Sequence, residues 1–445
     1  MERKSKATII LLAMLLISGC FGCVLVLCNY FAPMFSNSEG SAVLNIETYI
    51  DGKNQPTHPS VVDMGGEWNG FRYWMAYSPY PNANGAEENP CVCASNDMIH
   101  WTTPDGLYNP IAFNEETACD ELKDPHIVYN SDLNRLEVWY LGRLDSTIKN
   151  SGTLLLFRKV SSDGMHWSEY EIMRTLDGYL SPSVTYSDGK YKLWAIQASS
   201  SDNSGKLLYS ESEDGKKWGG TPVECSFGGS TELQRVWHGA VNCDDLYRFV
   251  FVEDSGKSEA VLYTESADGV TWQEPRTIIQ KENFWAAFYR PCILYSDSSF
   301  YCIYGVISRD NEWYLSMSTG ASPDELRGIS SQEVGVSETN SAIMAKHSII
   351  HLVKDTYHFI QSFCRPELVF VCTLVTVALL LSRRYSFAGA WGFSWLLCVL
   401  RFYGQIRWLA VSEICLLLFT VGTISALCTI AIEEILDLCF VSKRE

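Results

Sequence analysis

Short runs of alternating apolar and polar residues follow one another along the middle of the chain, and this alternation is typical of β-strands with two different faces. The residues that separate the runs are mostly Gly, Asp, Asn and Ser, which favour tight turns. Five of the runs are rich in aromatic residues, and they span residues 71–77, 136–140, 191–195, 247–251 and 300–304. We therefore predict an all-β domain built from many short strands.

A second kind of run marks the start of a repeating unit. A polar or charged residue is followed, in most copies by way of a proline, by a short apolar stretch. The copies begin at His58, Asp124, Ser181, His238 and Arg290, so the steps between them are 66, 57, 57 and 52 residues. Five copies at a near-constant step indicate a repeat architecture, in which each repeat is one supersecondary unit.

Each unit also carries a Ser-x-Asp-Gly-x-x-Trp motif or a variant of it. The copies begin at Ser95, Ser161, Ser212 and Ser266, and the fifth is reduced to Ser318-Thr319-Gly320. Asp-Gly favours a turn with positive φ, and we expect the tryptophan to begin the next strand and to pack between sheets. Together with the aromatic runs, the two landmarks predict a five-bladed β-propeller with four strands in each blade. Residues 42–49 are expected to close the ring against the last blade.

Apolar segments near both ends of the chain predict attachment to a membrane. A basic stretch at residues 1–6 precedes an almost uninterrupted apolar run at 7–31, which is long enough to span a bilayer. We expect an uncleaved signal anchor; the alternative is a lipoprotein, because residues 17–20 resemble a bacterial lipobox. In either case the basic end stays in the cytoplasm and the propeller is placed on the extracytoplasmic side of the membrane.

The composition changes again near residue 341. An amphipathic stretch at 344–364 is followed by apolar segments at 367–382, 385–400 and 408–432, and the middle one either spans the membrane or dips and returns. The predicted domains are therefore a signal anchor at 1–35, a β-propeller at 36–340, and amphipathic and transmembrane helices at 341–445.

The charge and the cysteines narrow the choice of partners. The formal net charge is −18 and the chain has no basic stripe, which argues against nucleic acid as the ligand. Sixteen cysteines are present, but the soluble part holds an odd number of them without metal-type spacing. This distribution supports neither a full disulfide framework nor a zinc site.

The repeat starts, the Ser-x-Asp-Gly-x-x-Trp motif and the pair Asp124-Pro125 make residues 45–335 resemble the five-bladed β-propeller glycosidases, a furanosidase-like superfamily of arabinanases, xylosidases and invertases. The resemblance implies an active site at one end of the central axis, where the innermost strands begin. It also implies three acids there: a carboxylate on blade one, an aspartate on blade two and a glutamate on blade three. Only Asp124 matches this set, because His58 and Ser181 occupy the other two positions.

Hydrolysis of a glycosidic bond uses two carboxyl groups, one protonated and one ionised, which lie about 5–10 Å apart. We therefore predict that Asp124 acts with a second carboxylate. The candidates are Glu253, which ends a strand, and Glu88, which lies on a loop over the axis. The strand end is favoured because rigid elements position chemistry better.

Histidine and arginine side chains can bond sugar hydroxyls, and aromatic rings can stack on sugar faces. The candidate substrate-binding residues are His58, Arg143, Trp237, His238, Tyr289 and Arg290. We expect no cofactor and no metal ligand set; a structural calcium ion in the axial channel is the alternative.

The leading hypothesis is an exported, membrane-tethered glycoside hydrolase that acts on a polysaccharide or oligosaccharide at the mouth of the propeller axis. One alternative is a propeller without catalysis that binds a surface glycan or a partner protein. Another is an accessory protein of surface-polysaccharide assembly.

Overall fold

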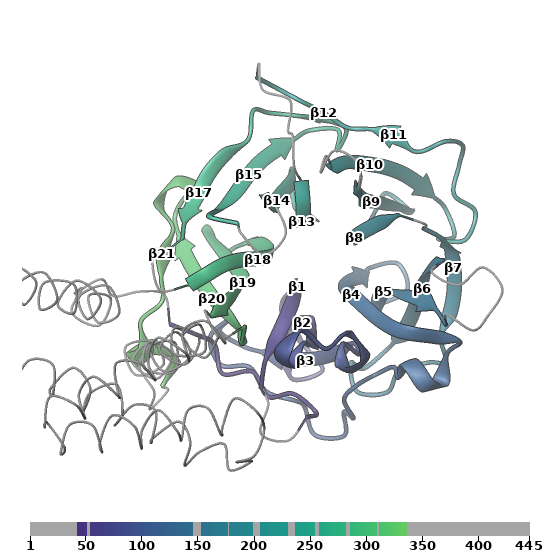
Figure 1. Ribbon diagram of the computed structural model, residues 1–445, viewed down its shortest axis with the longest axis horizontal. Coiled ribbons are helices and arrows are strands. Elements are labelled where there is room, and N and C mark those ends of the chain that lie inside the picture. The colour runs from purple at the N-terminus through teal and green to yellow at the C-terminus, as the bar shows by residue number, and fades with distance from the viewer. Residues whose placement is uncertain are drawn as a thin grey trace, which may run out of the picture. The chain divides into compact units, whose positions relative to one another are not determined.

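Five antiparallel sheets surround a central axis and form the blades of a β-propeller (Figure 1). The computed structural model describes residues 42–50, 54–145, 153–176, 178–198, 205–229, 236–253, 258–281, 285–308 and 311–335, all within the compact unit Asn37–Ile343. The predicted all-β fold and the number of blades are confirmed. The predicted membrane segments lie outside the described residues. Within the described ranges, no helix has the length and apolar character needed to cross a bilayer.

In every blade the strands run from the axis outward in chain order. The innermost strands, which line the axis in Figure 1, are β1 (Pro56–Trp68), β4 (Cys119–Asn130), β8 (Tyr179–Ser187), β13 (Val236–Cys243) and β18 (Trp285–Ser296). The second strands are β2 (Phe71–Pro79), β5 (Arg135–Leu144), β9 (Lys190–Ala198), β14 (Tyr247–Glu253) and β19 (Ser299–Ser308). The third strands are β3 (Cys91–Ser95), β6 (Leu154–Ser161), β10 (Gly205–Ser212), β15 (Ala260–Ser266) and β20 (Trp313–Gly320).

The outermost strands are short: β7 (Glu171–Thr175), β11 (Val223–Glu224), β17 (Arg276–Gln280) and β21 (Arg327–Gly328). Blade one departs from the expected four strands, because its sheet has three and Thr102 joins it only through an isolated bridge to Ala94. Pro104 follows soon after and has no N–H to offer a ladder, so the pairing does not extend. A short parallel pair, β12 (Ser226–Phe227) with β16 (Thr271–Trp272), connects blades three and four.

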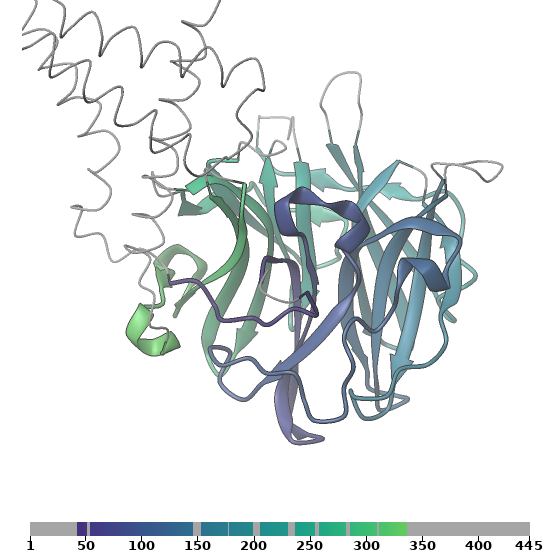
Figure 2. The ribbon, with the colours of Figure 1, turned by 60° about the horizontal axis from the view of Figure 1, so that its bottom comes forward.

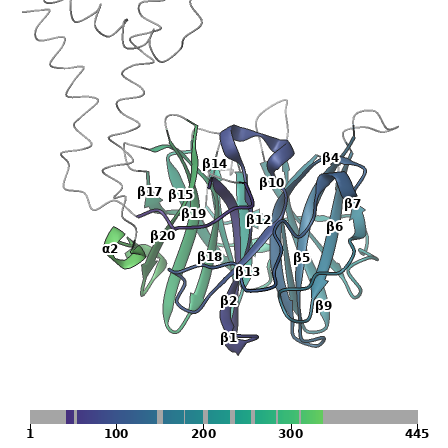
Figure 3. The same cartoon turned by 90° about the horizontal axis from the view of Figure 1, so that it is seen from below.

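Few helical turns occur in the part of the chain that the structure describes. Between β2 and β3 lie the 3₁₀ turns η1 (Pro81–Ala83) and η2 (Gly85–Glu87), which are seen in dark blue at one end of the propeller in Figure 2. Turn η3 (Asn114–Glu116) precedes β4, and η4 (Pro323–Glu325) and α2 (Ser331–Val334) follow β20. Pro56, at the start of β1, pairs with Pro79, at the end of β2. Turn η1 follows β2 directly, so it lies at the end of the axis where the inner strands start, and the other end of β1 lies at the opposite end of the propeller (Figure 3).

The segment before β1 closes the ring, as predicted, although it forms only one isolated bridge and not a strand. Val43 bridges Ser316 in β20, and the amides of Ala42 and Leu44 donate to the carbonyls of Ile329 and Leu315. The apolar side chains of this segment are buried between blade five and blade one. The first residues of the propeller are therefore held by the last blade.

The Asp-Gly turns of blades two, three and four pack each of these blades against the one before it. Their glycines have positive φ values, as predicted, and each lies against a tryptophan from the second strand of the preceding blade. The pairs are Gly164 on Trp74, Gly215 on Trp139 and Gly269 on Trp194, where an added Cβ would lie 2.2, 2.8 and 2.6 Å from the indole. Glycine is needed at these turns both for the left-handed backbone and for the close approach.

Candidate functional site

The five repeat starts coincide with irregularities in the strand pairing. Every inner strand has a register shift against its neighbour at this point, as in a β-bulge. His58, Asp124 and Ser181 have φ values of 54°, 54° and 46° there, in a region that residues other than glycine seldom adopt. Bulges re-aim side chains and often lie beside functional sites, and strained backbone persists where the surroundings hold it. The sequence repeat thus marks the positions that turn a side chain toward the axis.

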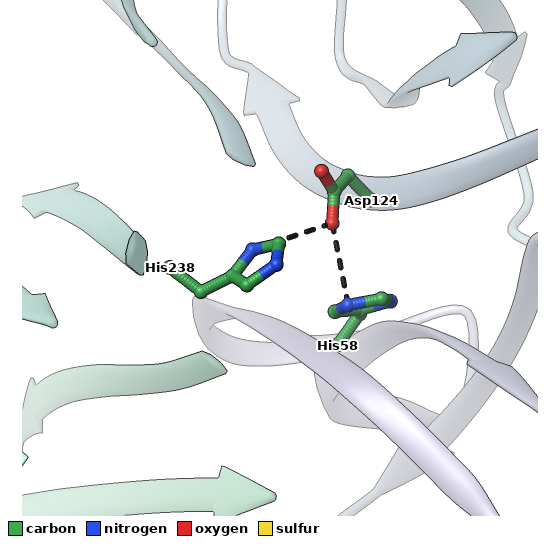
Figure 4. Close-up of side chains that lie close together, drawn as sticks. All are labelled: His58, Asp124 and His238. Atoms are coloured by element: carbon green, nitrogen blue, oxygen red, sulfur yellow. Dashed lines mark ion pairs between the residues drawn. The ribbon is translucent and has the colours of Figure 1, made fainter. Parts of the chain in front are cut away.

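Three of these side chains converge. Figure 4 shows His58 from β1, Asp124 from β4 and His238 from β13, with both imidazoles facing the same carboxylate. Nε2 of His58 lies 3.3 Å from Oδ1 of Asp124, and Nδ1 of His238 lies 3.8 Å from that oxygen. All three side chains are buried. We call them the His-Asp-His cluster.

Neighbouring groups hold the cluster in place. Nδ1 of His58 lies 2.7 Å from Oε1 of Glu88, which places that carboxylate on the side of the ring away from Asp124. The amide of Ser181 donates to Oδ2 of Asp124 at 2.8 Å, so this oxygen is occupied and Oδ1 is left for the imidazoles. The hydroxyl of Tyr289 lies 2.9 Å from Nε2 of His238.

Arg290 lies on the axis next to the cluster and is completely buried. Its Nη1 and Nη2 donate to the carbonyls of Pro125 and Pro182, each at 3.2 Å, and Nη1 is 3.6 Å from Oδ1 of Asp124. The guanidinium therefore joins three inner strands and places a positive charge beside the carboxylate.

Burial and charge set the protonation of the cluster. Burial lowers the pKa of both His58 and His238 to about 3, so both imidazoles are neutral near pH 7. Burial alone would raise the pKa of Asp124, but His58, His238 and Arg290 together outweigh it, and the carboxyl is ionised with a pKa well below its usual range. Glu88 differs, because burial and then the charge of Asp124 raise its pKa well above the usual value.

The donor atoms of the cluster fit a bound divalent cation. Nε2 of His58 and Oδ1 of Asp124 are buried and have no hydrogen-bond partner among the described residues, although they face each other. A separation of 3.3 Å suits two ligands that each lie about 2.1 Å from one ion. His58, Asp124 and His238 each offer one atom within 4.8 Å of the others; Nδ1 of His238 is in contact with the hydroxyl of Ser181 at 2.6 Å, and this hydroxyl would have to turn away for the nitrogen to bind an ion. Two imidazoles and one carboxylate suit zinc, iron or manganese better than calcium, which prefers oxygen ligands.

Of the two candidate second carboxylates, Glu88 on the loop contacts the cluster. Glu88 contacts His58 and accepts a hydrogen bond from the backbone amide of Asp124. Glu253 ends β14 opposite Val236. Since Glu88 and Asp124 lie against opposite nitrogens of His58, an imidazole fills the space between the two carboxyl groups. A glycosidase leaves that space open for the bond that is cleaved.

Two of the predicted substrate-binding residues lie farther out. Trp237 stands edge-on to His238, with ring centroids 5.5 Å apart, and its indole nitrogen is buried without a partner in the described part of the chain. Arg143, at the end of β5, pairs with Glu121 on the neighbouring inner strand. The other four, His58, His238, Tyr289 and Arg290, lie in or against the cluster.

Tyr80 also borders the cluster. Its ring centroid lies 6.5 Å from that of His58, and its side chain is half-buried. Burial and the charges of Glu88, Glu121 and Asp124 raise the pKa of Tyr80 to about 12. The phenol is therefore protonated near pH 7.

No protein-family model matches the chain. It is 30% identical over 277 residues to an A type blood N-acetyl-α-D-galactosamine deacetylase from Flavonifractor plautii, a match that covers 50% of this chain. The chain spans 35% of the length of that curated relative.

Solved structures resemble the propeller. A crystal structure of an N-acetylgalactosamine deacetylase from F. plautii, in complex with blood group B trisaccharide, has a TM-score of 0.55 and 20% identity, and the match covers 63% of this chain and 94% of that one. A thermostable family-43 glycoside hydrolase has a TM-score of 0.47 and 13% identity, with 64% and 97% covered. The deacetylase structure therefore shares the fold of this five-bladed propeller.

Proposed function

We propose that this protein is a metal-dependent N-deacetylase of an N-acetylated amino sugar in a glycan, and that hydrolysis takes place at the His-Asp-His cluster. The observation that carries the proposal is the pair of buried atoms, Nε2 of His58 and Oδ1 of Asp124, which face each other at 3.3 Å and have no hydrogen-bond partner among the described residues. The sequence similarity to a deacetylase that acts on N-acetylgalactosamine supports the same reaction class.

The proposed reaction is hydrolysis of an amide. The oxygen of water forms a bond to the acyl carbon, the bond from that carbon to nitrogen breaks, and the nitrogen takes up a proton, so the products are acetate and a free amino sugar. A divalent ion at the cluster supplies Lewis-acid chemistry, which makes water a better nucleophile at neutral pH and polarises a carbonyl group.

The residues of the chain prepare this site. Oε1 of Glu88 lies 2.7 Å from Nδ1 of His58, and the hydroxyl of Ser78 contacts the same nitrogen at 3.2 Å, so Nε2 faces the centre of the cluster. The amide of Ser181 and the guanidinium of Arg290 keep Asp124 ionised and fixed. Tyr289 orients the ring of His238. Each donor is therefore positioned by a second group before substrate arrives.

The glycoside hydrolase hypothesis is less well supported by this geometry, because His58 lies between Glu88 and Asp124. Membrane attachment remains part of the proposal. The apolar runs at 7–31 and beyond residue 341 lead us to propose a tethered enzyme that faces the extracytoplasmic side.

The experiment uses the full-length protein in detergent and a panel of glycans that end in N-acetylgalactosamine or N-acetylglucosamine. Acetate release, new primary amines and reducing sugar are measured separately. We expect acetate and amine in equal amounts, loss of both with a chelator, recovery with zinc or manganese, and loss in Asp124→Asn. Release of reducing sugar without acetate would falsify the deacetylase proposal in favour of glycosidic hydrolysis.

A further inference from the structure

Tyr80 is held rigidly at the mouth of the axis. It lies between Pro79 and Pro81 at the start of η1, and its backbone amide donates to the carbonyl of Gln55 at 2.8 Å. The side-chain oxygen of Gln55 accepts from the amides of Asn82 and Trp313, at 3.1 and 3.2 Å. The segment is thereby tied to blade five, and the two prolines restrict its backbone further.

The ring of Tyr80 is fixed as well. It packs edge-on against Trp313, with centroids 5.0 Å apart, and Trp313 packs in the same manner against Tyr289 at 4.7 Å. Trp313 is buried, so it cannot move aside. The three rings form a wall beside His58, and the phenol of Tyr80 stands at the outer end of this wall.

The hydroxyl of Tyr80 has no hydrogen-bond partner in the part of the chain that the structure describes. Its neighbours differ in this respect. The hydroxyl of Tyr77 donates to the carbonyl of Glu47, that of Tyr49 donates to the carbonyl of Glu87, and that of Tyr289 contacts His238. A tyrosine hydroxyl at a partly buried position usually finds a partner, so a substrate group is a natural candidate.

Other side-chain donors at this mouth are either engaged or buried: Nε of Arg290 and the indole nitrogens of Trp237 and Trp313 are buried without a partner in the described residues. Two N–H groups of Arg290 are given to backbone carbonyls, and Lys123 and Arg143 both pair with Glu121. The hydroxyl of Tyr80 is therefore a free donor on a fixed ring next to the cluster.

We propose that Tyr80 is a catalytic residue whose hydroxyl donates a hydrogen bond to the oxygen of the substrate's acyl carbonyl. This inference rests on the proposed deacetylation. When the oxygen of water adds to the acyl carbon, the π electrons of the carbonyl move to its oxygen, and the hydrogen bond from Tyr80 strengthens with the growing charge. When the carbonyl re-forms, the carbon–nitrogen bond breaks and Tyr80 keeps its proton. Donors aimed at such an oxygen contribute about 10²–10³-fold to the rate.

The test is Tyr80→Phe, which keeps the ring against Trp313 and removes only the hydroxyl. The matched control is Tyr129→Phe, because the hydroxyl of Tyr129 bonds Asn134 beyond the far end of β4, away from the cluster. With a soluble N-acetylgalactosamine glycoside, we expect kcat of Tyr80→Phe to fall about 10²-fold while KM changes less than about threefold. The control keeps kcat, and both variants keep the thermal midpoint of the parent.

A second arm separates a catalytic hydrogen bond from a purely structural role. The N-trifluoroacetyl analogue has a more electrophilic carbonyl, so its hydrolysis depends less on a hydrogen bond to the carbonyl oxygen. We therefore expect Tyr80→Phe to lose less kcat with this analogue than with the N-acetyl substrate. An equal loss of kcat with both substrates opposes a catalytic hydrogen bond from Tyr80. If the parent releases acetate and Tyr80→Phe keeps kcat within about threefold, the role of Tyr80 is overturned and the deacetylase proposal stands. If the parent releases no acetate from any glycan, both proposals are overturned.

Discussion

Replacement of Glu88 by glutamine tests whether the cluster binds a metal ion in the way its geometry indicates. Oε1 of Glu88 lies 2.7 Å from Nδ1 of His58, and the carboxyl is buried. Glutamine keeps the size of the side chain but cannot ionise, whereas a cation at the cluster would favour the ionised form of Glu88, so His58 becomes a weaker donor at Nε2 in the variant. Loss of such a supporting carboxylate costs 10–100-fold in metal affinity, which corresponds to about 1.4–2.7 kcal/mol.

The assay is a titration of the chelator-treated protein with zinc, followed by calorimetry and by acetate release. We expect the zinc dissociation constant of Glu88→Gln to rise about 10–100-fold, and kcat to recover most of its parental value at saturating zinc. The matched control is Glu87→Gln, one residue away, whose side chain makes no hydrogen bond or ion pair in the described part of the chain. Equal zinc affinity in Glu88→Gln and in the parent would refute the assignment of His58 as a ligand supported by Glu88.

Two further predictions concern the blades. Gly269→Ala places a Cβ 2.6 Å from Trp194 at a φ of +76°, so we expect the free energy of unfolding to fall by about 2–4 kcal/mol. The control is Gly189→Ala, where φ is +71° and nothing lies within 4 Å of the added Cβ, and for which we expect a loss of about 1 kcal/mol. Urea unfolding of both variants measures the two losses, and equal losses contradict the prediction. The pKa of Asp268 is lowered to about 2, and the hydrogen bond from the backbone amide of Thr271 makes the largest contribution to this shift. The stability that this carboxylate contributes is therefore present above its unfolded pKa of about 4 and is lost as the pH falls toward 2. Asp268→Asn should lower the unfolding midpoint at pH 6 and flatten its dependence between pH 4 and pH 2, and an unchanged slope opposes this reasoning.

The fold was largely predictable because its signals are local and repeated. The five strand starts and the Asp-Gly turns each recur at the same place in a blade, so every further copy along the chain supports the same assignment of strands and turns. The incomplete fourth strand of blade one was not predicted, since the motif at Ser95 is present and only the later Pro104 limits pairing. A sequence repeat predicts the features that the blades share and does not predict how one blade departs from them.

The site was predictable only where it follows the repeat. His58, Asp124 and His238 occupy equivalent starts, so their approach to the axis could be expected, and the structure brings them together. Glu88 lies outside the repeat, and its place over His58 depends on how the loop through η1 and η2 folds back. The left-handed backbone at His58 and Asp124 was also invisible, because a positive φ at residues other than glycine is imposed by tertiary contacts.

The chemistry of this propeller follows from which side chains the five bulges present. The resemblance to glycosidases implies acids on blades one, two and three. In hydrolysis of a glycosidic bond such acids act as an ionised carboxylate or as a proton donor. This chain keeps the acid of blade two alone and presents histidines on blades one and four, with serine and arginine on the remaining two. Each buried neutral imidazole offers one lone pair and carries no charge, so with the ionised Asp124 the two rings make a centre that attracts a cation. The same backbone device that positions acids for glycosidic hydrolysis would then position metal ligands for amide hydrolysis.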